Sequence, residues 1–154
     1  MKSDLENDLF YLLHDVAHLM RTRFDQRARF WGMTRAQCVI LMRLSKQPGM
    51  IQNEMAGQCE IEPITVARLV DRLEAAGYVE RRPDPADRRI NRLHLTPEAD
   101  PILQRIMKER EYASQYIMGD MDPAVREAAI VALKHMKQKL TTEDMSKVQA
   151  ELGE

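Results

Sequence analysis

The chain has 154 residues, 44% of them hydrophobic and 31% charged, and its formal net charge is −1 at pH 7. This length and composition predict one soluble globular domain with enough chain to bury a core. They exclude a membrane protein, because no apolar run approaches the roughly 18 residues that a spanning helix needs. The acidic N-terminus also lacks the basic and then apolar pattern of a signal peptide, so we expect a cytoplasmic protein.

The first predicted element is a long amphipathic helix over residues 3–29. Ser3 and Glu6 have the spacing of a capping box, in which each side chain bonds the other residue's backbone N–H. An apolar stripe recurs behind them at helical spacing: Leu5, Leu9, Leu12, Leu13, Val16, Leu19 and Met20. A helix of this length cannot bury its whole face on a small core, so we expect a second chain to cover part of it.

Three short elements follow the long helix. Thr34 and Gln37 form a second capping box, which begins a helix that ends before a Pro-Gly pair. Residues 50–52 predict a short strand, and residues 53–58 predict a short helix. Together with the helix that follows it, this short helix forms a helix-turn-helix pair.

Residues 63–76 predict the second helix of that pair. Pro63 suits the first turn, where its missing N–H costs nothing, and Gly77 ends the helix because it can adopt the left-handed conformation. A buried face is predicted from the spacing of four apolar residues: Val66, Leu69, Val70 and Leu73. A second, polar stripe lies opposite: Thr65, Arg68 and Arg72. Arginine can bind O6 and N7 of guanine together in the DNA major groove, so we expect this stripe to contact DNA, with Ile64 either at a thymine methyl group or in the core.

A charged hairpin follows the second helix. Residues 78–82 lead into a turn-rich tip at residues 83–89, and residues 91–95 alternate polar and apolar side chains as a strand should. A helix followed by a hairpin with basic residues at its tip indicates a winged helix-turn-helix. The predicted fold is therefore mainly α with a small β-hairpin wing, an α+β arrangement.

The last third of the chain predicts further helices. Thr96 is expected to cap a helix that begins at Pro97, is bent by Pro101 and ends near Met118. After a stop at residues 119–123, the next helical region carries an apolar stripe: Val125, Ala129, Val131, Ala132, Leu133, Met136 and Leu140. A final turn or helix offers three more apolar residues: Met145, Val148 and Leu152.

The expected single domain, residues 1–154, thus has a winged helix-turn-helix over about 34–95 and dimerisation helices over about 3–29 and 97–152. Long terminal helices are most economically used by winding around a second copy of the chain. A two-fold dimer places its recognition helices about 34–36 Å apart and reads a pseudo-palindromic DNA site.

Three segments resemble the signature of the MarR transcription regulators. They are Leu73-x3-Gly77-Tyr78-Val79-x-Arg81, then Asp84-x2-Asp87-Arg88-Arg89, then Leu95-Thr96. The run Glu98-Ala99-Asp100-Pro101 resembles the SlyA branch, since most of the family has glycine at the position of Ala99. The resemblance implies a bacterial homodimer that binds a double-stranded DNA operator, as a repressor, and is released by a small aromatic or phenolic anion. In the family pattern, an aspartate at the position of Asp87 orients an arginine at the position of Arg89 for the minor groove.

Eight residues are expected to contact DNA: Pro63, Ile64, Thr65, Arg68, Arg72, Asp87, Arg88 and Arg89. Arg81, Arg82 and Arg92 are expected to touch phosphates or solvent, which gives salt-sensitive affinity without sequence choice. Asp71 and Glu74 are expected to be salt-bridge partners. The stretch that holds these groups carries a charge of +2 although the whole chain is negative, and such local asymmetry steers a protein onto phosphates.

The resemblance also implies an effector pocket between the dimer helices and the reading head, which is the winged helix-turn-helix over about 34–95. The candidates by position are His18, Arg21, Trp31, Gln37 and Arg68. Arg68 has two conceivable roles, in this pocket or at a DNA base, and we favour the base.

Other classes of function have weaker support. No catalytic motif is present, so we expect neither an enzyme nor a cofactor. His14 and His18 lie at i, i+4 and can share a metal ion, but no third and fourth ligand is evident, so we expect no metal site. Cys38 lies on an apolar helix face, which is typical of an inert thiol. Three alternatives stay open: a winged-helix module that binds proteins, an effector-independent regulator, and a zinc-responsive regulator.

Overall fold

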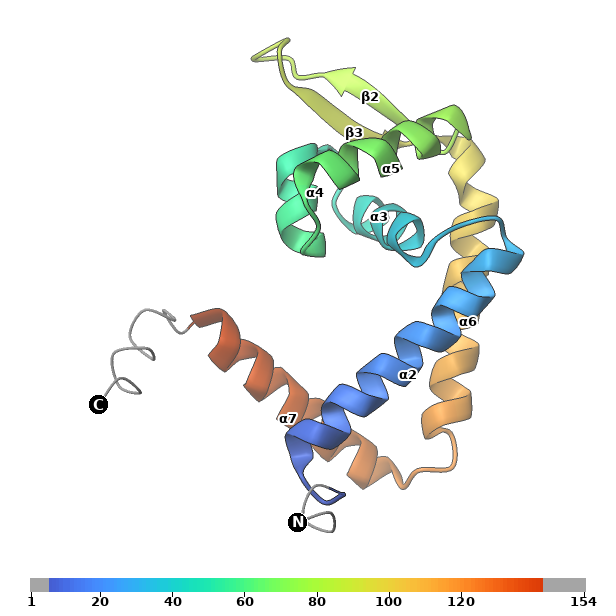
Figure 1. Ribbon diagram of the computed structural model, residues 1–154, viewed down its shortest axis with the longest axis vertical. Helices are drawn as coiled ribbons and strands as arrows, with labels where there is room; N and C mark the ends of the chain where they lie inside the picture. The colour runs from blue at the N-terminus through green and yellow to red at the C-terminus, as the bar shows by residue number, and fades with distance from the viewer. Residues whose placement is uncertain (1–5, 143–154) are drawn as a thin grey trace. The chain divides into compact units, whose positions relative to one another are not determined.

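We describe residues 6–142 of the chain in a computed structural model (Figure 1). The chain divides into two compact units, Met1–Met107 and Lys108–Glu154. Among the described residues, the first unit holds all three strands, four α-helices and the start of a fifth, and it carries the candidate site. The assignment of residues 1–154 to a single domain stays a prediction.

Helix α2 spans Leu9–Phe30, and it begins later than the sequence analysis predicts. Residues 6–8 lie in a turn, and Asp8 is the N-cap, since its Oδ1 accepts a hydrogen bond from the backbone N–H of Tyr11 at 2.8 Å. Aspartate competes well with serine as an N-cap, which explains why the helix starts here and not at residue 3. The predicted capping residue Ser3 lies outside the described residues.

Most of α2 is exposed in the single chain. Only its C-terminal end joins the core, through the buried Ala28 and the half-buried Phe24. The apolar stripe is exposed at six of the predicted positions: Leu9, Leu12, Leu13, Val16, Leu19 and Met20. The reasoning that one core cannot cover this helix is therefore confirmed for the chain by itself.

Three helices form the centre of the first unit: α3 (Arg35–Lys46), α4 (Gln52–Cys59) and α5 (Pro63–Ala75). Figure 1 shows them packed together, with the hairpin extending beyond them. The capping box of α3 is confirmed, since Gln37 N–H donates to the Thr34 hydroxyl and Thr34 N–H donates to the Gln37 side chain at 2.9 Å. The predicted face of α5 is buried: Val66, Leu69, Val70 and Leu73.

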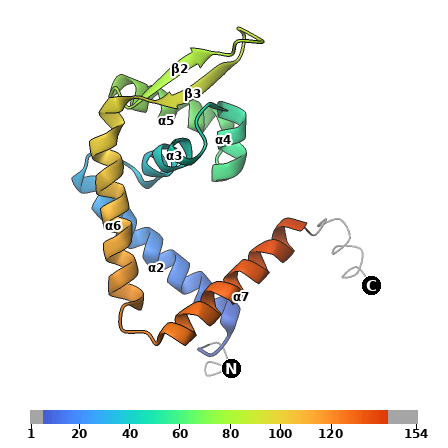
Figure 2. The same ribbon diagram turned by 180° about the vertical axis from the view of Figure 1, so that it is seen from behind.

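The sheet has three antiparallel strands in the order β1-β3-β2. They are β1 (Met50–Ile51), β2 (Val79–Pro83) and β3 (Asn91–Leu95), so both the hairpin and the short first strand are confirmed. Both ribbon views show β2 and β3 running side by side away from the helices (Figure 2). Gly77 has φ +79°, the left-handed conformation that ends α5 and turns the chain into the wing.

The junction after the wing differs from the prediction. A 3₁₀ turn, η1 (Pro97–Ala99), comes first, and α6 (Asp100–Met118) begins after it. Pro101 therefore lies in the first turn of an α-helix, where no N–H partner is needed, and is not a bend inside a longer helix. Thr96 was expected to cap this helix, but its hydroxyl donates to the carbonyl of Gly77 instead.

The second unit contains the end of α6 and helix α7 (Pro123–Thr142). Asp122 begins α7, because its Oδ1 accepts the backbone N–H of Ala124 at 2.8 Å. Apolar side chains of α7 are exposed: Val125, Ile130, Val131, Leu133 and Leu140. The predicted final segment with Met145, Val148 and Leu152 lies outside the described residues. Within residues 6–142, no helix has the length and apolar character that crossing a bilayer requires.

Candidate nucleic-acid interface

The exposed side of α5 carries the five residues predicted to enter the major groove. All of them are exposed to solvent: Pro63, Ile64, Thr65, Arg68 and Arg72. Ile64 is 63% exposed, so it is not part of the core. Between residues 6 and 142, neither the Arg68 side chain nor the Arg72 side chain has a hydrogen-bond or ion-pair partner. The helix thus presents two unengaged guanidinium groups beside a hydroxyl and an apolar side chain.

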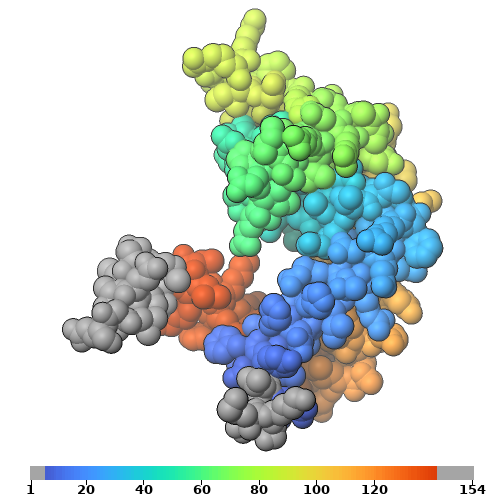
Figure 3. Space-filling model, in the orientation of Figure 1, coloured from blue at the N-terminus to red at the C-terminus, as the bar shows by residue number. Residues whose placement is uncertain are grey.

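The wing tip projects from the surface of the first unit, as the space-filling view shows (Figure 3). Arg88 is exposed there and has no hydrogen-bond or ion-pair partner in the described part of the chain. Arg89 is 90% exposed and is held by Asp87, whose Oδ2 lies 2.8 Å from its Nη2. Donation from the Arg89 side chain, and then from its backbone N–H, lowers the pKa of Asp87. The tip therefore presents one arginine held in place and one without a partner.

Asp84 organises the tip, a role that the sequence analysis missed. Its side chain is nearly buried, and its Oδ1 accepts the backbone N–H of Ala86 at 2.7 Å and that of Asp87 at 3.2 Å. These bonds, with the Arg92 side chain donating to Oδ2, lower the pKa of Asp84. An Asp that is followed by Pro in a turn-rich segment is a recognised turn signal, and it could have revealed this role.

The three arginines expected at phosphates or in solvent are bound within the chain. Arg92 donates to the carboxylate of Asp84 and to the carbonyl of Gly49 at 2.8 Å, while 42% of its side chain stays exposed to solvent. Arg82 is exposed but paired with Glu80, two residues away on the same strand. Arg81 is mostly enclosed, and its guanidinium bonds three other side chains. The enclosure of Arg81 departs from the expectation, because its acceptors lie on α4 and α5, which pack beside β2.

The five effector candidates lie on α2, in the turn that follows it, on α3 and on α5. His18 and Arg21 are exposed on α2, and Arg68 is exposed on α5. Trp31 is half-buried against Phe24, with ring centroids 6.3 Å apart, and Gln37 belongs to the capping box of α3. Among the described residues, no hydrogen bond, ion pair or ring contact joins any two of the five candidates. A surface recess on α2 is lined by other residues: Gln26, Arg29 and Phe30.

Groups that ligate metals or react as nucleophiles are sparse in the described ranges. No cluster of three or more His, Cys, Asp or Glu residues there could hold a metal ion, and both His14 and His18 are exposed. Cys38 is fully buried, and burial raises the pKa of its thiol to about 11. The arrangement offers surface cations and hydrogen-bond donors, which bind polyanions.

Comparisons with known proteins agree with this geometry. A sequence model of the MarR family matches residues 33–90, which run from just before α3 to the tip of the wing. The HTH-type transcriptional regulator YsmB of Bacillus subtilis is 31% identical over 136 residues, which cover 86% of this chain and 93% of that protein. The chain belongs to the MarR family.

Two solved structures extend the match beyond the sequence. The crystal structure of MarR is 26% identical to this chain and has a TM-score of 0.76. That match covers 87% of this chain and 91% of the MarR chain. BpsR of Bordetella bronchiseptica, whose DNA binding is regulated by 6-hydroxynicotinic acid, is 26% identical with a TM-score of 0.71. That match covers 90% of this chain and 96% of BpsR.

The family assignment decides several expectations. MarR-family proteins and the relatives named above are transcriptional regulators, so this chain is a regulator with a winged helix-turn-helix and not an enzyme. The MarR resemblance of the motifs around the wing is confirmed. Assignment to the SlyA branch stays a prediction, as do the roles of the individual site residues.

Proposed function

We propose that this MarR-family regulator is a homodimeric repressor that occludes a promoter by binding a pseudo-palindromic operator. The observation that supports it best is the set of arginines left exposed on two elements of the first unit. Arg68 and Arg72 lie on α5, and Arg88 and Arg89 lie at the wing tip. Neighbouring Arg81 is mostly enclosed and Arg92 is bound by Asp84 and Gly49, so not every arginine of this region is presented in this way.

In the proposed complex, α5 lies in the major groove and the wing grips the adjacent minor groove. Arg68 and Arg72 bind guanine edges or phosphates, while Thr65 donates a hydrogen bond and Ile64 meets a thymine methyl group. Pro63 opens the helix so that its first turn approaches the bases. Arg89, oriented by Asp87, enters the minor groove, where arginine responds to groove width and negative potential.

The proposed dimer uses the terminal helices. The exposed apolar residues of α2 form a continuous stripe and are not scattered singly over the surface, and α7 has an exposed apolar series as well. Covering these faces with a second chain gives a two-fold assembly with half-sites about 34–36 Å apart.

An effector completes the proposal. BpsR responds to a small aromatic acid, and we extend that chemistry to this chain, with a pocket between the dimer helices and the reading head. The proposed ligand-contacting residues are His18, Arg21, Trp31, Gln37 and Arg68. Such an anion releases DNA only if it binds the DNA-incompetent arrangement more tightly, because a ligand shifts an equilibrium by its difference in affinity.

Fluorescence anisotropy with duplex DNA from upstream of the chain's own gene tests the proposal. We expect tight binding. The logarithm of the association constant should fall with the logarithm of the salt concentration, with a slope of about −0.9 per phosphate contact. Arg89→Ala should weaken operator binding about five-fold or more. Arg29→Ala on α2 removes the same charge from another exposed arginine and should change affinity little.

The alternatives appear as distinct outcomes. A protein that binds every duplex weakly and equally, and ignores Arg89→Ala, would be a winged-helix module for protein partners. A protein that binds its operator tightly but does not respond to hydroxylated nicotinic or benzoic acids would be an effector-independent regulator. A stable monomer that still binds the operator would overturn the dimer.

A further inference from the structure

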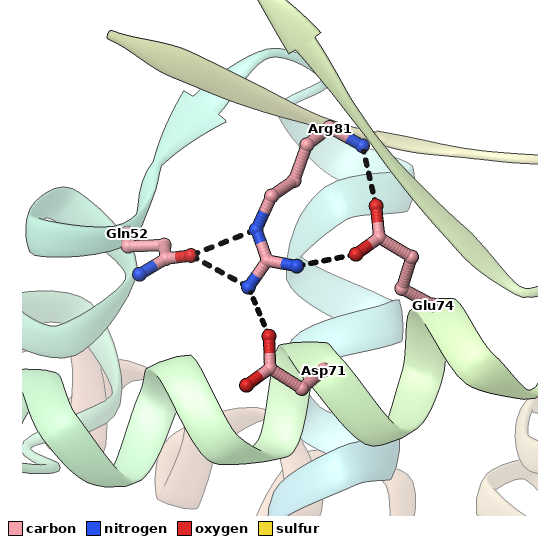
Figure 4. Close-up of polar contacts among 4 residues, drawn as sticks. All are labelled: Gln52, Asp71, Glu74 and Arg81. Carbon is pink, nitrogen blue, oxygen red and sulfur yellow. Dashed lines mark hydrogen bonds and ion pairs between the residues drawn. The ribbon is translucent and has the colours of Figure 1, made fainter. Parts of the chain in front are cut away.

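Arg81 lies at the meeting point of three elements of the reading head. Figure 4 shows its guanidinium group enclosed by Gln52 of α4 and by Asp71 and Glu74 of α5. Its Nε and Nη2 lie 3.1 and 3.0 Å from Oε1 of Gln52, and Nη2 lies 2.6 Å from Oδ1 of Asp71. Nη1 donates to Oε2 of Glu74. The backbone of the same residue adds a fifth contact, since Arg81 N–H donates to Oε1 of Glu74 at 3.2 Å.

These contacts differ from ordinary surface ion pairs. The Arg81 side chain is 20% exposed, and its planar guanidinium makes several fixed bonds at once, which gives geometric specificity that a single flexible pair lacks. Its partners come from both helices of the helix-turn-helix pair, while Arg81 itself belongs to the first strand of the wing. Arg81 also pairs with Leu93 in the register of the sheet, so the strand cannot shift without moving the guanidinium.

We propose that Arg81 is a positioning residue which fixes the wing relative to the recognition helix, so that both reach their grooves together. This inference rests on the proposed DNA-binding function and adds a residue that does not itself touch DNA. When α5 and the wing are held rigidly together, binding of one of them to its groove places the other at a high effective concentration beside its own groove. That advantage disappears when the angle between them is free to vary.

The proposal predicts coupling between Arg81 and Arg89. The Arg81 guanidinium bonds Gln52, Asp71 and Glu74, whereas the Arg89 guanidinium bonds Asp87, so the two arginines share no partner. Independent sites without shared partners usually have additive effects. If Arg81 positions the wing, Arg89→Ala should instead lose most of its effect once Arg81 has been replaced, since a loosened wing contributes little in either case.

The experiment is a double-mutant cycle on operator affinity, with Arg81→Gln, Arg89→Ala and the combined variant. Asp71 and Glu74 are partly exposed and remain hydrated after Arg81→Gln, so the variant should fold. We expect the loss from Arg89→Ala to shrink about three-fold or more in the Arg81→Gln background. Circular dichroism and thermal unfolding show that each variant is compared in its folded form.

Arg82→Gln is the matched control, because Arg82 is the next residue of the same strand but pairs only locally with Glu80. Its effect should combine additively with Arg89→Ala. A second variant, Gln52→Ala, removes the contact to α4 while leaving both ion pairs of Arg81, and it decides the matter if Arg81→Gln does not fold. It should couple to Arg89→Ala in the same direction.

The outcomes separate this inference from the function on which it rests. If Arg89→Ala weakens binding but the cycle is additive within about two-fold, the positioning role is wrong and the proposed function stands. If Arg89→Ala alone has no effect, the wing does not read DNA and both proposals fail. A salt slope that falls by about 0.9 in Arg81→Gln, with additive affinities, would make Arg81 a phosphate contact instead.

Discussion

The carboxylate of Asp87 holds both the backbone and the side chain of Arg89. Its Oδ1 accepts the Arg89 backbone N–H at 3.0 Å and Nε at 3.0 Å, and its Oδ2 accepts Nη2 at 2.8 Å. The arginine is nevertheless 90% exposed, so it is oriented without being buried. A long side chain that is ordered before binding loses less conformational entropy when it enters a groove.

The Asp87–Arg89 contact leads to a prediction in which two effects oppose each other. Asp87→Asn removes a negative charge from the wing, and long-range attraction to phosphate alone would strengthen DNA binding. It also weakens the contacts that orient Arg89. Ordering one such side chain is worth about 0.5–1.5 kcal/mol, so we expect operator affinity to fall by about two- to ten-fold.

Anisotropy titrations at one fixed salt concentration measure this change. Asp120→Asn, which removes one carboxylate from the turn after α6, is the control for net charge and should leave affinity nearly unchanged. Tighter binding by Asp87→Asn than by the wild type would contradict the orienting role.

A second prediction concerns Asp84 and pH. The pKa of Asp84 is below its ordinary value, first because of the Ala86 backbone N–H and then because of Arg92. A carboxylate with a lowered folded-state pKa stabilises the fold above its unfolded pKa of about 4, and this stabilisation is lost as pH falls through the folded-state value. Asp84→Asn should therefore lower the free energy of unfolding at pH 7, and the difference from the wild type should shrink below about pH 4.

Urea unfolding of both proteins at several pH values between 7 and 3 tests the pH prediction. Because Asn keeps an acceptor for the turn N–H groups but carries no charge, the comparison isolates the ionised form of Asp84. If the difference in the free energy of unfolding between the two proteins stays constant down to pH 3, the charge of Asp84 contributes nothing to stability.

Local sequence signals account for much of the fold. The capping box of Thr34 and Gln37 and the left-handed Gly77 operate within about four residues, so the chain itself contains the information. The start of α2 was missed because Ser3 and Asp8 are both good caps, and local spacing does not decide between them. Thr96 was wrongly predicted to cap a helix because the acceptor that its hydroxyl bonds, the carbonyl of Gly77, is 19 residues away.

The candidate site was predictable only where it is exposed. The stripe of Arg68 and Arg72 follows from helix periodicity, so the sequence already places these groups opposite the core. Arg81 and Arg92 were assigned to phosphate or solvent because their acceptors lie far along the chain, 29 residues away at Gln52 and 43 at Gly49. The periodicity of a helix or a strand does not indicate which side chains so far apart in the sequence will meet. The effector pocket stays a prediction, because it was placed between two chains and the periodicity of one chain does not indicate such a site.

A third prediction tests the dimer through α2. Leu12 and Val16 lie one turn apart on the exposed stripe, so Leu12→Glu with Val16→Glu places two charges where a partner chain would bury them. We expect the variant to sediment as a monomer at micromolar concentration and to lose most of its operator affinity, because half-site binding replaces binding to the whole palindrome.

His14→Glu is the matched control for the dimer test, since His14 is exposed on the same helix but outside the apolar stripe. It should remain a dimer in analytical ultracentrifugation. A double variant that stays dimeric with unchanged affinity would show that the stripe of α2 is not the interface.

The last prediction concerns the two cysteines. Burial raises the pKa of Cys38 to about 11, and it also raises the pKa of the half-buried Cys59, so both thiols are protonated at neutral pH. The thiolate is the reactive form, so we expect slow modification of the folded protein by a disulfide reagent and rapid modification of both thiols after denaturation. Peroxide should leave operator binding unchanged for the same reason. Cys59→Ser isolates the buried thiol: a rapid reaction in this variant would mean that α3 opens, whereas a rapid reaction only in the wild type would make Cys59 the exposed, reactive group.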